Sequence, residues 1–191
     1  MIFDIRKALS LPDIHNSVAK REGVLGRFGP LFRDPTSLTK QDYLEFLSFK
    51  HNHHWTGLER LGRPAADNMD NLRDAITRLV DESLPLPERF DDAIAQIDGV
   101  SWATLTPLLL IAYPNQYGIW NGTSEPEMRE RGLWPTFSRG ATAGEKYESI
   151  NAVLVNLARD HDVDLWTLDS LWWVGKLGSE PIKVLVMANF H

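Results

Sequence analysis

The sequence contains no cysteine. That absence excludes disulfide bonds, thiolate nucleophiles, and zinc or iron–sulfur centres with cysteine ligands. No apolar run approaches the length of a membrane span, because the longest, Pro107 to Tyr113, is only the length of a core segment. The N-terminus lacks the basic-then-apolar profile of a secretory signal peptide, so we expect a cytoplasmic protein without membrane contact.

Several catalytic motifs are also missing. The sequence has no Gly-x-x-x-x-Gly-Lys-Ser/Thr phosphate loop and no Gly-x-Gly-x-x-Gly turn for a nicotinamide cofactor. It has no Gly-x-Ser-x-Gly nucleophile elbow and no His-Glu-x-x-His zinc motif. We therefore expect neither a nucleotide-hydrolysing enzyme nor a bound cofactor.

Acidic and basic residues are unevenly distributed along the chain. The 191 residues carry a net charge of −6, which argues against indiscriminate binding to nucleic acid. Residues 1–64, however, hold ten Lys or Arg and seven Asp or Glu, a net of +3, so the remainder carries −9. A basic face on an acidic protein is one interpretation, and a solvated surface of mixed charge is the other.

Helical periodicity covers most of the chain. Capping-box patterns open three predicted helices, at Thr39-x-x-Asp42, Ser124-x-x-Glu127 and Thr142-x-x-Glu145. Helical spacing of apolar residues predicts further helices over about 69–80, 88–96 and 165–175.

Loops and strands are few. Segments 23–37 and 134–144 are predicted loops, and the second is polar enough to be a binding loop. Only Ile182 to Met187 has an extended pattern. We therefore expect an all-α fold. The chain length fits a single domain over 1–191, with helical lobes over about 1–82 and 83–175 and a short C-terminal tail.

The most informative segment is a glycine-containing turn between two helical patterns. It reads Ile97-Asp98-Gly99-Val100-Ser101-Trp102-Ala103-Thr104, and an apolar run connects it to Ile119-Trp120-Asn121. Such a turn directs free backbone amides outward from the start of the second helix, where they attract phosphate. Asn121, 18 positions after Ala103, would return to the mouth of this hairpin.

The segment from about Pro85 to Leu133 resembles the helix-hairpin-helix DNA glycosylase superfamily. In that superfamily a Leu-Pro-Gly-Val-Gly-like turn holds a DNA phosphate through backbone amides. A later Lys attacks the sugar in bifunctional members, and a later Asp activates the nucleophile or stabilises the sugar cation. The resemblance implies a two-lobed helical fold and a nucleic-acid contact made by Gly99, Val100, Ser101, Trp102 and Thr104.

The two catalytic positions depart from the family pattern. Ala103 stands where the Lys would be, and Asn121 stands where the Asp would be. Asn cannot supply the negative charge that stabilises an oxocarbenium ion, although it can orient a water or hold a base edge. Asn121 is therefore the one candidate catalytic residue of a divergent member. In the structural alternative, Gly99 is a helix C-cap and Asn121 an N-cap or turn residue.

A second candidate site lies earlier, in Asn52-x-x-Trp55-x-Gly57-Leu58-x-Arg60. Asn52, Trp55 and Arg60 would bring an amide, an indole and a guanidinium together on about two helical turns, a set suited to stacking a base and pairing with phosphate. In the alternative, Trp55 and Leu58 pack inside and Arg60 pairs with a carboxylate.

Two other clusters carry less information. Among His51, His53 and His54, the first and last share a helical face and could bind zinc, but a third ligand on that face is missing, because the nearest carboxylate, Glu59, lies off it; we therefore expect no metal site. Arg139 and Lys146 flank the start of the helix after the second loop and could bind phosphate or nucleic acid there, where the acidic Glu145 would compete.

Three functional hypotheses follow. The first is a DNA-recognition domain on a glycosylase-like helical scaffold, acting in repair or defence without catalysis. The second is an active base-excision DNA glycosylase, in which Asn121 orients water or another carboxylate substitutes. The third is a helical protein-interaction module whose exposed tryptophans contact a protein partner.

Overall fold

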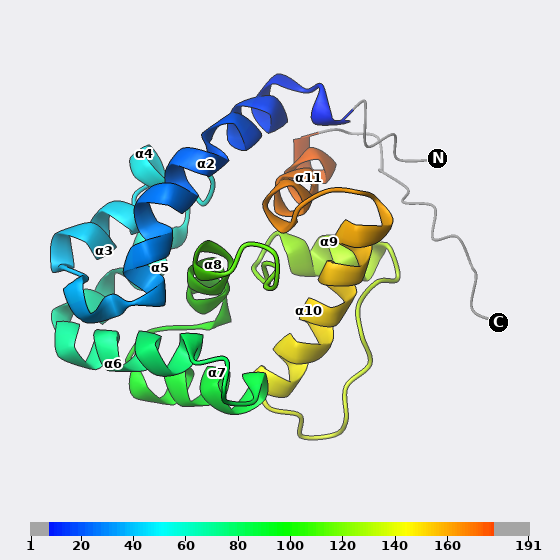
Figure 1. Ribbon diagram of the computed structural model, residues 1–191. Coiled ribbons are helices and arrows are strands. Elements are labelled where there is room, and N and C mark those ends of the chain that lie inside the picture. The colour runs from blue at the N-terminus through cyan, green and yellow to red at the C-terminus, as the bar shows by residue number, and fades with distance from the viewer. Residues whose placement is uncertain (1–7, 178–191) are drawn as a thin grey trace.

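The computed structural model describes residues 8–177 of the chain, which fold into helices without any β-strand in that range (Figure 1). The all-α prediction is thus confirmed, whereas the extended segment predicted over 182–187 lies outside the described residues. The helices are α2 (Pro12–Arg33), α3 (Lys40–Leu47), α4 (Phe49–Asn52), α5 (Leu58–Gly62), α6 (Met69–Val80), α7 (Leu86–Gln96), α8 (Trp102–Ala112), α9 (Ser124–Glu130), α10 (Ala143–Asp160) and α11 (Leu165–Leu177), with two short 3-10 helices, η1 (Pro35–Ser37) and η2 (Arg63–Asp67).

Helix α8 lies at the centre of the molecule (Figure 1). It packs against α2, α5, α6 and α7, and every residue from Thr104 to Ala112 is buried. A helix surrounded on all sides needs apolar residues on all sides, which explains why this segment is a continuous apolar run instead of an amphipathic pattern. One connected apolar core extends from Val24 to Trp172, so residues of both predicted lobes contribute to it.

Two predicted capping boxes are present. The Thr39 hydroxyl accepts from the amide of Asp42, whose carboxylate accepts from the amide of Thr39 at the start of α3. Thr142 and Glu145 make the same reciprocal pair at the start of α10. The third predicted box is not formed, because Ser124 is the first residue of α9 instead of its N-cap, and its hydroxyl accepts from the amide of Asn121.

The predicted loop over 23–37 is wrong for most of its length, since α2 continues to Arg33. Glycines and Pro30 suggested a loop, but Val24, Phe28 and Phe32 recur at helical spacing and are almost completely buried. Their face packs against α8. Burial of this apolar face outweighs the weak helix propensity of the glycines.

Candidate functional site

The predicted hairpin is present between α7 and α8. Gly99 has a φ of 75°, a left-handed conformation that glycine adopts without strain. Ser101 is the N-cap of α8, and its carbonyl accepts from the amides of Thr104 and Leu105. Thr104 itself is fully buried, so of the five predicted contact residues Gly99, Ser101 and Trp102 are accessible, next to the exposed Asp98. Val100 is buried under the turn and contributes only its backbone.

An indole stack connects the hairpin to the Asn121 segment. Trp102 is 39% exposed, and its ring stacks on that of Trp120, with centroids 4.9 Å apart and an interplanar angle of 17°. Trp120 is held in place by Thr106 of α8, whose Oγ1 accepts from its amide and donates to its carbonyl. The start of α8 and the residue before Asn121 therefore lie on the same side of the molecule.

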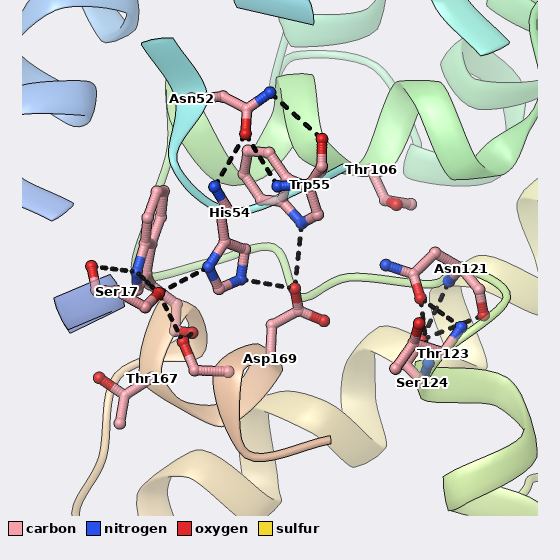
Figure 2. Close-up of polar contacts among 12 residues, drawn as sticks. Ser17, Asn52, His54, Trp55, Thr106, Asn121, Thr123, Ser124, Thr167 and Asp169 are labelled. Atoms are coloured by element: carbon pink, nitrogen blue, oxygen red, sulfur yellow. Dashed lines mark hydrogen bonds and ion pairs between the residues drawn. The ribbon is translucent and has the colours of Figure 1, made fainter. Parts of the chain in front are cut away.

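Asn121 forms a turn that starts α9 (Figure 2). Its Oδ1 accepts from the amides of Thr123 and Ser124 at 2.7 and 3.0 Å, and its own amide donates to the Ser124 hydroxyl at 2.9 Å. This geometry agrees with the alternative interpretation, in which Asn121 is an N-cap or turn residue. The side chain is partly exposed, and its Nδ2 has no hydrogen-bond partner among residues 8–177, so Nδ2 remains able to donate.

Two arginines, Arg60 and Arg63, precede the residue that contacts the hairpin turn. A Cβ added to Gly99 would come within 3.4 Å of Pro64, so the turn rests against η2. Arg63 begins η2 and pairs with Glu59 at 3.2 Å. Arg60 is exposed, and within the described part of the chain it has neither an ion pair nor a hydrogen-bonding side chain. The carboxylate partner that the alternative assigned to Arg60 is therefore not seen.

Asn52 and Trp55 lie inside the protein instead of forming a surface for a base. Asn52 is fully buried; its Nδ2 donates to the carbonyls of Phe46 and Leu47, and its Oδ1 accepts from the amides of His54 and Trp55 at 2.8 Å each. Trp55 is 4% exposed. Leu58 is also buried. Trp55 and Leu58 therefore pack inside the protein, as the alternative interpretation of this segment predicts.

The start of α10 offers little to a phosphate. Besides the Thr142–Glu145 capping box, the amide of Gly144 donates to Asp91 Oδ1 at 2.8 Å. Carboxylates of the protein thus already bond the free amides, because an anion at this position is stabilised by the helix dipole. Arg139 is exposed on the preceding loop and Lys146 is partly exposed on the helix, without a binding site formed between them.

A serine–histidine–aspartate relay, formed by Ser17, His54 and Asp169, was not predicted from the sequence. Ser17 Oγ lies 2.7 Å from His54 Nδ1, and His54 Nε2 lies 2.8 Å from Asp169 Oδ2 (Figure 2). Trp55 Nε1 donates to the same carboxylate oxygen at 3.0 Å. The three relay residues come from α2, the segment after α4, and α11, and no local motif connects them.

A pocket of about 800 Å³ adjoins this relay. Its polar lining residues include Ser17, His54, Ser170, Asp13 and Lys20, and its apolar ones include Leu11, Ile14, Phe49 and Trp173. His53 also lines the pocket; partial burial, together with the positive charge of Lys20 and His51, lowers the pKa of its imidazole.

No group of three potential metal ligands occurs within residues 8–177. In the same range, no helix is both long and apolar enough to span a bilayer. Comparisons of the chain with protein-family models, curated proteins and solved structures find no match.

Proposed function

We propose that the chain recognises DNA through the hairpin between α7 and α8 and the adjoining Asn121 turn. The observation that carries the proposal is the stack of the exposed Trp102 on Trp120, which brings the first turn of α8 and Asn121 to one surface. This is the arrangement that the resemblance to helix-hairpin-helix glycosylases requires, with a backbone-binding turn beside a base-contacting residue.

Phosphate binding would use the backbone at the start of α8. Trp102 and Ala103 occupy the first helical positions, where amides have no carbonyl one turn earlier to bond. The helix dipole adds partial positive charge at the same end. Arg60 lies on the neighbouring segment without a carboxylate partner and would neutralise a further phosphate, whereas Arg63 is paired with Glu59.

Base contacts would come from Trp102 and Asn121. An exposed indole stacks on any base, because every base has a π-face. The free Nδ2 of Asn121 can donate to an acceptor on a base edge. Neither Ala103 nor Asn121 supplies the amine or the carboxylate of the glycosylase reaction, so we propose recognition without cleavage of the glycosidic bond.

The exposed surface favours DNA over a protein partner. Of the seven tryptophans, all within the described range, only Trp102 is exposed. A protein-binding surface of the kind expected from the high tryptophan content would present several aromatic side chains together.

The test is a titration of fluorescent single- and double-stranded oligonucleotides between about 50 and 200 mM salt, in which affinity should fall steeply as salt rises. Trp102→Ala should weaken binding about 5- to 150-fold, the range for loss of one stacked base, and Trp102→Phe should restore part of it. Phe49→Ala is the matched control, since Phe49 is an exposed aromatic residue beside the pocket and not at the hairpin.

A second variant separates phosphate contacts from base contacts. Arg60→Gln should reduce the slope of log affinity against log salt by about one unit, while Arg159→Gln on α10 should leave it unchanged. Absence of salt-dependent binding to both DNA forms would overturn the proposal, as would a Trp102→Ala variant that binds like the wild type.

A further inference from the structure

We propose that Ser17, His54 and Asp169 act as a catalytic relay that hydrolyses small carboxylic esters in the adjoining pocket. This activity is independent of DNA binding, because the relay shares no residue with the hairpin or the Asn121 turn. Four features support it: the order of the hydrogen bonds, the rigid placement of the imidazole, the access from the pocket, and a cation beside the nucleophile.

The hydrogen bonds follow the order that nucleophilic catalysis requires. A carboxylate only accepts hydrogen bonds, so Asp169 Oδ2 holds the proton of the neutral imidazole on Nε2, 2.8 Å away. The lone pair on Nδ1 then faces the Ser17 hydroxyl at 2.7 Å. His54 is thereby placed to take the proton of Ser17, while Asp169 orients the ring and stabilises its charged form.

Packing fixes the imidazole in this orientation. The His54 ring lies 4.4 Å from the Trp166 ring and meets Trp55 edge to face at 4.8 Å, measured between centroids. His54 and Asp169 are 6% and 2% exposed, and preorganised hydrogen bonds are strong in such surroundings. Oδ1 of Asp169 has no hydrogen-bond partner among the described residues. An unpaired buried carboxylate oxygen lowers the stability of the fold, and a network with only a structural role would not require it.

A substrate can reach the nucleophile. Ser17 is partly exposed and lies on the wall of the pocket, whose volume is in the range that small ligands occupy. Leu11 and Phe49, two of the three exposed large apolar side chains of residues 8–177, line the same pocket. An apolar acyl chain of a few carbons would bury these side chains, which points to short-chain esters as the substrate class.

Positive charge lies one turn from the nucleophile. Lys20 follows Ser17 by three positions on α2, and both residues line the pocket, as does the acidic Asp13, four positions before Ser17. Ser170 Oγ lies 3.0 Å from Ser17 Oγ, and its hydroxyl donates to the carbonyl of Trp166. An ammonium group on the pocket wall is the kind of group that stabilises a tetrahedral oxyanion.

The reaction balances without any co-reactant except water. Ser17 Oγ bonds to the ester carbonyl carbon as its proton passes to His54 Nδ1. The bond to the leaving alkoxide then breaks, and the alkoxide departs as an alcohol with that proton. Water, deprotonated by His54, attacks the acyl-serine; the carboxylic acid is released and the proton returns to Ser17.

The experiment uses the full chain with two probes, an alkyl fluorophosphonate and p-nitrophenyl butyrate. An activated serine displaces fluoride from the first, so mass spectrometry of the digested protein should find the adduct on Ser17. Hydrolysis of the second should be at least about tenfold faster than with Ser17→Ala, and the labelling rate of His54→Gln should fall about a hundredfold or more. Ser138→Ala removes an exposed loop hydroxyl and should change neither result.

A pH profile distinguishes catalysis from a structural role. The labelling rate of the wild type should rise with pH as one group deprotonates, and this rise should disappear in His54→Gln. Circular dichroism and melting curves would establish that each variant is folded. The labelling site in the wild type decides the matter even if a variant unfolds: a folded wild type that carries no adduct on Ser17 would overturn the proposal. Labelling of folded His54→Gln at the wild-type rate would do the same.

Discussion

His54 Nε2 lies 2.8 Å from Oδ2 of Asp169, a carboxylate 115 positions later in the chain. The contact joins the segment after α4 to α11, and both side chains are 2% exposed. Because Trp55 Nε1 donates to the same oxygen, one buried carboxylate satisfies two ring nitrogens that would otherwise have no acceptor.

Asp169→Ala should destabilise the protein by about 3 kcal/mol or more, because it leaves two buried ring nitrogens without an acceptor. Urea unfolding followed by tryptophan fluorescence would measure the loss as a lower midpoint at unchanged slope. Glu148→Ala removes an exposed carboxylate on α10 and should change stability by no more than about 0.5 kcal/mol. Equal effects of the two variants would contradict this account of the network.

Asn52→Ala should also be strongly destabilising, by about 3 kcal/mol. The buried amide bonds carbonyls at the end of α3 and the amides of His54 and Trp55, and alanine would leave all of these backbone groups unpaired. Asn16→Ala, at an exposed position of α2, is the comparison and should have little effect. An Asn52→Ala variant with the wild-type unfolding midpoint would show that water replaces these bonds at no cost.

Two glycine-to-alanine changes should have opposite signs. A Cβ on Gly144 would lie 2.2 Å from the carbonyl oxygen of Pro87, so Gly144→Ala must separate α10 from α7 and should cost on the order of 2 kcal/mol. A Cβ on Gly26 meets nothing within 4 Å, so Gly26→Ala inside α2 should stabilise by about 0.5–1 kcal/mol. Thermal melts of both variants check the prediction. A loss of stability in Gly26→Ala would contradict the finding that α2 continues as a helix to Arg33.

The titration of His53 should respond to its neighbour Lys20. Desolvation lowers the pKa of His53 first, and the charges of Lys20 and His51 add to it. Because the folded pKa lies below the ordinary value of 6.5, the unfolded chain binds the proton more readily. The neutral ring's contribution to stability is therefore complete above that value and is lost as pH falls from it through the folded pKa.

Lys20→Gln should raise the pKa of His53 toward its ordinary value, as measured by NMR titration of the imidazole protons. Lys40→Gln is the matched control, since Lys40 is an exposed lysine paired with Asp67 on another surface. A His53 pKa that does not move in Lys20→Gln would contradict a contribution from the Lys20 charge and leave desolvation and His51 as the causes.

Local signals in the sequence located several elements correctly. The capping boxes at Thr39 and Thr142 and the apolar stripe over 69–80 predicted α3, α10 and α6, because each signal depends on residues within one or two turns. The glycine turn at Gly99 was identified for the same reason. The Ser124 pattern failed because Ser124 lies inside α9, where its amide donates to Asn121 Oδ1 and its hydroxyl accepts from the Asn121 amide.

Contacts between distant segments could not be predicted in this way. Trp55 had two interpretations of equal weight, base stacking or core packing, and only the position of Asp169 in α11 decides for the core. Ser17 carried no signal at all, since its partner His54 lies 37 positions away and belongs to a different element.

The amino-acid order alone determined the helical class, most helix starts and the hairpin turn, because propensity, periodicity and capping act between near neighbours in the chain. Only the tertiary structure decided that α2 runs through a glycine-rich segment, that Asn121 starts α9, and that Ser17, His54 and Asp169 meet beside a pocket. Each of those outcomes depends on which surfaces become buried together, and burial is a property of the assembled helices.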